Sequence, residues 1–319
     1  QNIRGFGPVN KASMIRSVYD GYDTFFVRIV HSTFTKNYAD YPKIIAFRKI
    51  SKALYHNISL ISNIGGFHVT NNKASVFTRS IFIGNKGKSL GVISVKNGVQ
   101  ILIFNNSFID NECQEKSGAI HLDSTHAITI MGCIVRNNVA QNRGGALEVT
   151  NAKQLVIISC TFINNSAVLG GAIYSKEVFH TFTKNSIFMG NTAKEEGGAV
   201  YFHNSINNTN EKNCYKSNYA LNSGGAIFLT VGLVLCNYQC LYESNAAGKS
   251  HGGSVYMTQI NKLYEMSLVH RKCKSGTHGG SSYYSNVNKI IVVNSTYYEN
   301  SALYNGGAQF GLFIEKWSM

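Results

Sequence analysis

Apolar and polar side chains alternate along this chain in short runs. Residues 178–182 (VFHTF), 186–188 (SIF) and 199–202 (AVYF) are typical. A period of two indicates β-strands, and the glycine, asparagine and serine between the runs favour tight turns. The pattern therefore predicts an all-β protein of strands four to six residues long.

The strands return in a fixed order, because a Gly-Gly-Ala-Ile/Val tetrad recurs every 25 to 28 residues. The second glycines of the ten copies are Gly66, Gly91, Gly118, Gly145, Gly171, Gly198, Gly225, Gly253, Gly280 and Gly307. A unit of about 27 residues cannot bury a core alone, so the copies must stack. Three short strands per unit, each paired with its equivalent one repeat later, predict a right-handed single-stranded parallel β-helix of about 10–11 coils. Ten coils at ~4.8 Å each make a rod roughly 50 Å long.

A second motif, aromatic-x-x-Asn, ends about seven residues before the glycines. Its copies begin at Phe34, Phe82, Phe108, Phe162, Phe188, Tyr215, Tyr242 and Tyr297, with Val135 as a variant. The copy before Gly280 has His270 and Cys273 instead, and the copy before Gly66 is unclear. We expect the aromatics and the small residues two positions earlier, such as Cys133, Cys160 and Cys240, to fill the coil interior. The asparagines are expected to adopt left-handed turn conformations and to stack their amides along the rod.

The two motifs together resemble the GGA(I/L/V) and FxxN repeats of the chlamydial polymorphic membrane proteins, which are also found in surface proteins of some protists. The resemblance covers roughly residues 80–312. It implies a cell-surface passenger domain that acts as an adhesin or antigen. The bacterial family members also carry a carboxy-terminal membrane barrel, which is not visible in this sequence.

One continuous solenoid is expected, with 1–65 as degenerate coils or a cap and 66–319 as regular repeats. The end at Trp317-Ser318-Met319, half a coil past the last glycine, suggests a piece of a longer chain. No stretch of 18 apolar residues occurs. Seven cysteines show no disulfide framework spacing. Five glycosylation sequons begin at Asn57, Asn105, Asn164, Asn207 and Asn294, a number that an asparagine-rich chain also reaches by chance.

The outward face of the glycine strand is the candidate binding surface. In each copy, the residue after the apolar one that follows the tetrad's alanine should point outward. These residues begin with His121 and Glu148 and continue as an aromatic stripe: Tyr174, Tyr201, Phe228, Tyr256, Tyr283 and Phe310. Six exposed aromatics on successive coils would form a patch suited to a sugar or protein partner. The alternative is that this stripe only stiffens the sheet or is covered by a neighbouring loop.

Catalytic and metal sites have weaker support. Polysaccharide-active β-helices need paired carboxylates, and the best cluster here is Asp123 and Glu148 beside His121. A solvated rim is the simpler interpretation of that cluster. His251 and His278 share a column one coil apart, with Cys273 nearby, and would make an incomplete zinc site. We expect no cofactor.

The net charge of +14 favours acidic partners, although scattered lysines also fit a coding bias. The sequence thus predicts a non-enzymatic, adhesin-like or antigenic surface module, with glycans among the expected ligands. Its partners would be a host or neighbouring-cell surface protein, an acidic glycan, or a larger parent chain or assembly, with no specific nucleic acid. The expected location is extracellular, tethered through a segment outside this sequence. The alternatives are a structural scaffold, which could be intracellular, and a polysaccharide lyase or hydrolase.

Overall fold

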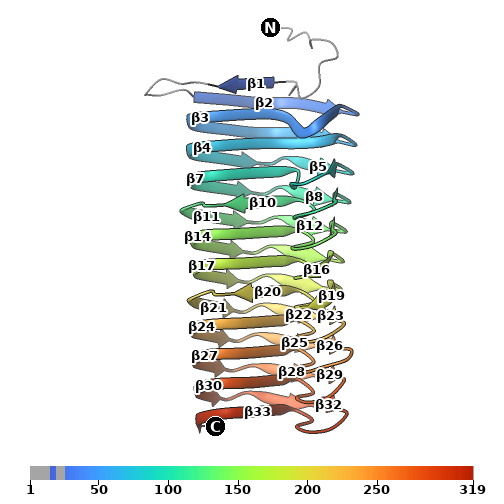
Figure 1. The fold of residues 1–319 in the computed structure, drawn as a ribbon, viewed down its shortest axis with the longest axis vertical. Helices are drawn as coiled ribbons and strands as arrows, with labels where there is room; N and C mark the ends of the chain where they lie inside the picture. The colour runs from blue at the N-terminus through green and yellow to red at the C-terminus, as the bar shows by residue number, and fades with distance from the viewer. Residues whose placement is uncertain (1–14, 19–25, 319) are drawn as a thin grey trace.

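Each repeat forms one coil of a parallel β-helix, and about 11 turns of ~27 residues stack into a rod (Figure 1). The computed structural model describes residues 15–18 and 26–318, and this part of the chain contains strands but no helix. Neighbouring coils pair in parallel and in register, as where Leu147 lies beside Ile173 and Glu148 beside Tyr174. The expected repeat period and strand pairing are confirmed.

Three kinds of strand build the coil. The longest crosses the first face and bends onto the second: β2 (Phe26–Thr35), β3 (Tyr38–Ile61), β4 (Ile64–Thr78), β7 (Ile93–Phe104), β14 (Leu147–Ile158), β17 (Ile173–Lys184), β24 (Ile227–Tyr238), β27 (Val255–Met266), β30 (Ser282–Val293) and β33 (Gln309–Ser318). Two coils divide it at the bend, into β10 (Ile120–Asp123) with β11 (Ala127–Met131) and β20 (Val200–His203) with β21 (Asn207–Glu211). β1 (Ile15–Val18) pairs with β3.

The other two kinds are shorter. The aromatic-x-x-Asn motif begins within β5 (Ile81–Ile83), β8 (Ser107–Ile109), β12 (Ile134–Arg136), β15 (Thr161–Ile163), β18 (Ile187–Met189), β22 (Cys214–Lys216), β25 (Leu241–Glu243), β28 (Val269–Arg271) and β31 (Thr296–Tyr298). The strand before the glycine turn is β6 (Lys86–Gly87), β9 (Glu112–Cys113), β13 (Val139–Ala140), β16 (Ser166–Leu169), β19 (Thr192–Glu196), β23 (Tyr219–Ala220), β26 (Ala246–Ala247), β29 (Lys274–Ser275) or β32 (Ser301–Ala302).

Left-handed residues make the corners of every regular coil. In the coil that starts at β14 they are Asn151, Ser159, Asn164 and Gly170. The second glycine of the tetrad has a different requirement: a Cβ on Gly171 would lie 2.1 Å from the carbonyl oxygen of Gly198 in the next coil. That glycine therefore allows two backbones to approach closely.

The core is a set of columns that run through the rod. The residue after the tetrad's alanine is buried in most copies, as the sequence predicts: Ile120, Leu147, Ile173, Val200, Ile227 and Val255. The rings of the second motif stack face to face inside, with Phe188 centred 5.0 Å from Phe162 and 4.9 Å from Tyr215. Cys133, Cys160 and Cys240 are buried beside them, and all seven cysteines are free thiols.

The motif's asparagines form a buried amide ladder. The side-chain amide of Asn138 donates to the Oδ1 of Asn165 at 3.0 Å, and Asn165 donates in turn to Asn191 at 3.0 Å. The same Oδ1 atoms also accept the backbone N–H of the asparagine one coil earlier, at 3.0 Å in both cases. The expected stacking is confirmed, but the expected backbone conformation is wrong. Left-handed geometry belongs to the residue before each asparagine, as at Asn137 and Asn164.

The amino-terminal coils follow the same plan with altered residues. Leu60 and Asn63 take the place of the motif that the sequence leaves unclear, and Asn63 is part of the amide ladder. β3 and β4 pair in parallel across the 65/66 boundary. Strand pairing therefore continues from residue 26 into the regular repeats.

Candidate functional site

The outer file of the glycine strand is an aromatic stack, as its sequence spacing requires. The rings from Tyr174 to Phe310 lie one above another with centroid separations of 5.2, 5.1, 4.7, 5.1 and 5.5 Å. Interplanar angles of 17° or less make this a continuous offset stack along six coils.

The expected exposure of this stripe is wrong. Tyr174, Phe228 and Tyr283 are buried at 5–6 % exposure, and the other three rings are half-buried. Turns before double glycines supply part of the cover: the His251 ring stacks on Tyr283 with centroids 4.3 Å apart, and the Arg143 guanidinium lies over the Tyr174 ring. Burial also raises the pKa of Tyr201 to about 12. Little ring surface is left for a ligand to stack on.

The proposed zinc ligands do not form a metal site. His251 and His278 do stack, with ring centroids 5.2 Å apart, and the Nδ1 of His251 lies 2.5 Å from the Thr277 hydroxyl. Cys273 instead points into the core, where its thiol contacts the Ser254 hydroxyl at 2.9 Å. Within residues 15–18 and 26–318, no three His, Cys, Asp or Glu side chains gather closely enough to hold a metal ion.

The candidate acidic cluster is divided into two separate groups. Glu148 is buried and its carboxylate lies 3.4 Å from the Nδ1 of His121 and 3.9 Å from the Nε of Arg143. Asp123 accepts hydrogen bonds from Thr150 at 2.9 Å, from Asn151 and from Ser124. It also forms an ion pair with Lys96. Those hydrogen bonds lower the pKa of Asp123 against the opposing effect of burial. Each carboxylate already has local partners, an arrangement that is typical of structural acids.

A polar network inside the carboxy-terminal coils was missed by the sequence analysis. Glu265 is fully buried, and its two carboxylate oxygens accept hydrogen bonds from Tyr284 at 2.8 Å and Tyr297 at 2.9 Å. Gln309 donates to the Tyr297 hydroxyl at 2.6 Å. Burial raises the pKa of Glu265, while these hydrogen bonds partly oppose that shift. The network is enclosed by the coils and has a structural role.

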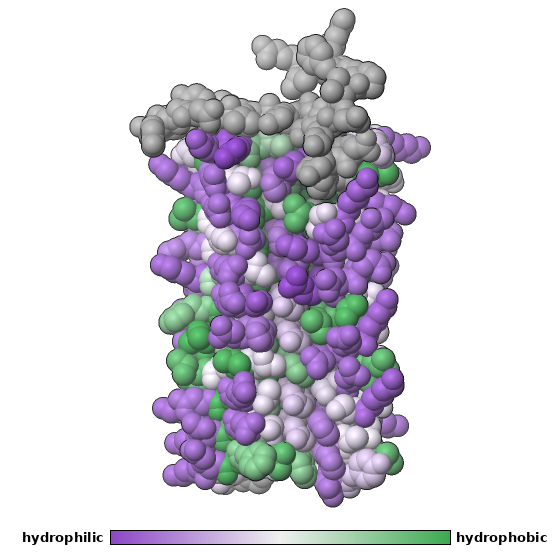
Figure 2. All heavy atoms as spheres, viewed as in Figure 1, coloured by the Kyte–Doolittle hydropathy of each residue, from purple (hydrophilic) through white to green (hydrophobic). Residues whose placement is uncertain are grey.

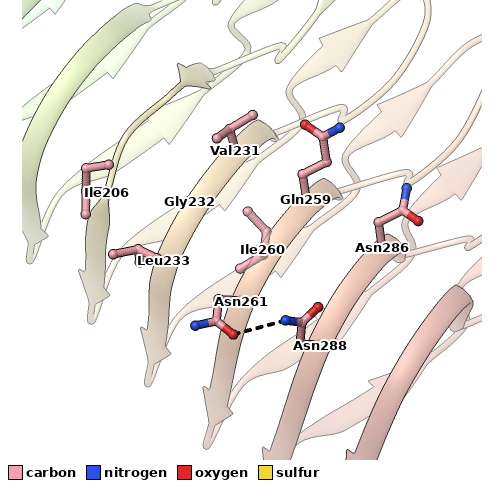
Figure 3. Close-up of a pocket in the computed structure, with 9 residues that line it drawn as sticks. All are labelled: Ile206, Val231, Gly232, Leu233, Gln259, Ile260, Asn261, Asn286 and Asn288. Atoms are coloured by element: carbon pink, nitrogen blue, oxygen red, sulfur yellow. Dashed lines mark hydrogen bonds between the residues drawn. The ribbon is translucent and has the colours of Figure 1, made fainter.

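A surface hollow of about 450 Å³ lies at the bend of the long strands (Figure 3). The bends of β24, β27 and β30 line it, and Ile206, just before β21, lines it on the preceding coil. The lining residues are Ile206, Val231, Gly232, Leu233, Gln259, Ile260, Asn261, Asn286 and Asn288. It combines an aliphatic floor with four side-chain amides and holds no charged group.

Three features of β24 open this hollow. Gly232 occupies the column in which Val178, Ile260 and Val287 bury a side chain, so the wall is thinner there. Leu233 is half exposed, and Val231 is exposed with φ of 60°. A β-branched residue rarely adopts that conformation, and such outliers concentrate at functional sites.

Amide groups complete the hollow's rim. The Asn288 amide donates to the Oδ1 of Asn261 at 3.2 Å across two coils, as Figure 3 shows. Gln259 and Asn286 lie at the neighbouring left-handed corner, and all four side chains reach solvent. On the face shown in Figure 2, polar side chains predominate and apolar ones gather in small groups.

The sequence held a signal for this hollow. Residues 231–233 (VGL) place an apolar residue at the corner, where most other copies have asparagine or serine, and another one two positions later, where most other copies have a polar residue. This difference is seen only when the copies are aligned at the corner residue. The strand pairing, in which Gly232 lies beside Ile260, gives that alignment.

A family model for the Chlamydia polymorphic membrane protein repeat matches residues 159–176 and 181–203. The matched segments run from the corner before β15 through β20, leave residues 177–180 unmatched between them, and include two copies of each motif. Neither a curated protein nor a solved structure matches the chain. None of the described residues forms a helix that could cross a membrane.

Proposed function

We propose that this chain, whose repeats are of the polymorphic membrane protein type and indicate a surface-exposed β-helix, is a non-enzymatic adhesin-like module that binds glycans. The observation that carries the proposal is the hollow between β24, β27 and β30. Its size is in the range of ligand pockets, and a mostly apolar lining with a few polar groups is their usual composition.

The chemistry of the lining fits a sugar. The C–H faces of a sugar ring pack on aliphatic side chains, while amides both donate to and accept from its hydroxyl groups. The four amides come from β27 and β30 and lie to one side of the aliphatic residues Ile206 and Leu233, with Ile260 between Gln259 and Asn261 in the chain. Since the hollow itself holds no carboxylate, hydrolysis would lack the paired acids that it requires.

The test is a glycan array followed by titration of the strongest hits. Replacing Asn261 and Asn288 by alanine should weaken binding at least about tenfold, because two hydrogen-bonding groups are lost. The matched control replaces Asn71 and Asn97, another exposed amide pair bonded at 2.8 Å across coils, by glycine, which suits their positive φ. That variant should bind like the wild type.

Two results would overturn the proposal. The first is an array without any hit for the folded wild-type chain. The second is equal binding by wild type and by the Asn261/Asn288 variant. Shortening of a bound oligosaccharide, followed by mass spectrometry, would instead show an enzyme.

A further inference from the structure

Three lysines stand on successive coils beside the hollow. β27 pairs with β30 so that Lys262 lies next to Lys289, and β30 pairs with β33 so that Lys289 lies next to Lys316. Adjacent rungs are ~4.8 Å apart, so the three cations form a column along the rod axis. Lys262 and Lys316 are exposed and Lys289 is half-buried.

This column lacks the partners that other lysines of the rod have. Lys184 meets Glu211 on the next coil at 2.9 Å, and Lys216 meets Glu243 at 3.2 Å. Within the described part of the chain, no carboxylate lies within 4.0 Å of the ammonium groups of Lys262, Lys289 or Lys316.

Stacked like charges destabilise a sheet, and an external anion would relieve the repulsion. Glu315, next to Lys316 in the sequence, is exposed and likewise has no ion pair among the described residues, while Glu265, three residues after Lys262, is buried in the core. One carboxylate leaves the three lysines with an excess of positive charge.

The lysine column and the hollow are contiguous. Lys262 directly follows Asn261 and Lys289 directly follows Asn288, so the cations border the amide rim. Phe313, with 73 % of its surface exposed, takes the corner position of Asn286 on the next coil. One corner of the rod thus carries, over successive coils, the aliphatic floor and amides of the hollow, the lysine column and the exposed ring of Phe313.

We infer that this corner binds a linear polysaccharide carrying carboxylate or sulfate groups, with its chain along the rod axis; the inference rests on the proposed glycan binding. Lysines on adjacent rungs would hold the anionic groups, and the hollow would hold a ring between them. Single-stranded nucleic acid fits less well, because its bases stack on a series of aromatic side chains and the hollow has none.

Binding is measured with three polysaccharide probes, polygalacturonate, heparin and neutral dextran, and with single-stranded DNA. Changing Lys262, Lys289 and Lys316 together to glutamine should weaken binding of polygalacturonate or heparin at least about tenfold and flatten its salt dependence. The control changes Lys88, Lys194 and Lys249, which are exposed in the segments before the tetrad glycines, to glutamine. It removes the same net charge and should change affinity less than about threefold.

Polygalacturonate and heparin distinguish a carboxylated ligand from a sulfated one, and binding of either supports the inference. Equal losses in the two lysine variants would overturn it, because the attraction would then depend on net charge alone. DNA binding as tight as that of the polysaccharides, with the same lysine dependence, would overturn it as well. A third outcome would separate the two proposals. If the wild type binds glycans, the Asn261/Asn288 variant loses that binding and the Lys262/Lys289/Lys316 variant keeps it, then the inference is wrong while the proposed function stands.

Discussion

At the scale of single residues, the amide ladder explains why asparagine recurs. Each ladder Oδ1 accepts two hydrogen bonds from the asparagine one coil earlier, and each Nδ2 also donates to a backbone carbonyl, as Asn165 does to Val135 at 3.0 Å. A primary amide supplies two N–H donors and, on a separate atom, an oxygen that can accept twice, whereas a serine or threonine hydroxyl has a single donor. Cys273 interrupts the ladder, and there Asn245 turns to the Ser254 hydroxyl at 3.3 Å.

Replacing Asn165 by alanine should therefore lower the free energy of unfolding by about 2–4 kcal/mol, since it leaves buried donors and a carbonyl of neighbouring coils without partners. The measurement is urea unfolding followed by circular dichroism. The adjacent Asn164 is exposed at a left-handed corner, so Asn164→Gly should stay within about 0.5 kcal/mol of wild type. Equal losses in both variants would contradict a specific role for the ladder.

His270 replaces the motif aromatic and makes stability depend on pH. It is fully buried between Tyr242 and Tyr297, with ring centroids 4.4 and 4.7 Å away, and burial lowers its pKa to about 3. The unfolded chain, with an ordinary histidine pKa near 6.5, binds a proton that the folded chain does not. The stability contributed by neutral His270 is thus complete above pH 6.5 and falls as the pH drops from 6.5 towards 3.

Changing His270 to phenylalanine should reduce the loss of unfolding free energy between pH 7 and pH 4 by on the order of 2–3 kcal/mol. Urea unfolding at several pH values measures this. The exposed His180 serves as control, and His180→Gln should keep the wild-type profile. An unchanged profile for the His270 variant would show that His270 is protonated within the fold.

At the scale of strands, the outer aromatic stack acts as reinforcement between coils. Tyr174 and Tyr283 are covered by residues of the turns before double glycines, and face-to-face contact at 4.7–5.5 Å along the stack adds to the backbone ladder. Changing Tyr201, Phe228 and Tyr256 together to serine should lower the unfolding free energy by several kcal/mol and leave glycan affinity unchanged in the folded fraction.

Thermal unfolding and the glycan titration test that pair of expectations. A suitable control is Phe179→Ser, because that ring is 52 % exposed and its loss should cost little. If the Tyr201/Phe228/Tyr256 variant lost glycan binding but kept its stability, the aromatic stripe would be the binding site.

Strand register could be predicted from sequence because the repeat fixes which residues stack. The order from Tyr174 to Phe310 follows directly from a 27-residue period and an alternation of two. Exposure could not be predicted, because it depends on how the turn carrying His251 folds back over Tyr283. Glu265 was missed for a similar reason: its hydroxyl partners come from two other strands, β30 and β31.

At the scale of the whole molecule, the rod has a regular interior and an irregular side. Successive coils share their core columns, while the corner at β24, β27 and β30 departs from the pattern through Val231, Gly232 and the unpaired lysine column. Because every coil carries the same corner, a ligand can extend over several of them. The binding surface that we propose is therefore a local variation of the repeat.

The most direct measurement is a crystal structure of the chain soaked with an oligosaccharide of galacturonic acid or of heparin. We predict sugar density along the corner of β24, β27 and β30, with a ring over Leu233 and Ile260 and acidic groups near Lys262 and Lys289. Density over the Tyr174–Phe310 stack, or an empty corner at saturating ligand, would contradict the account.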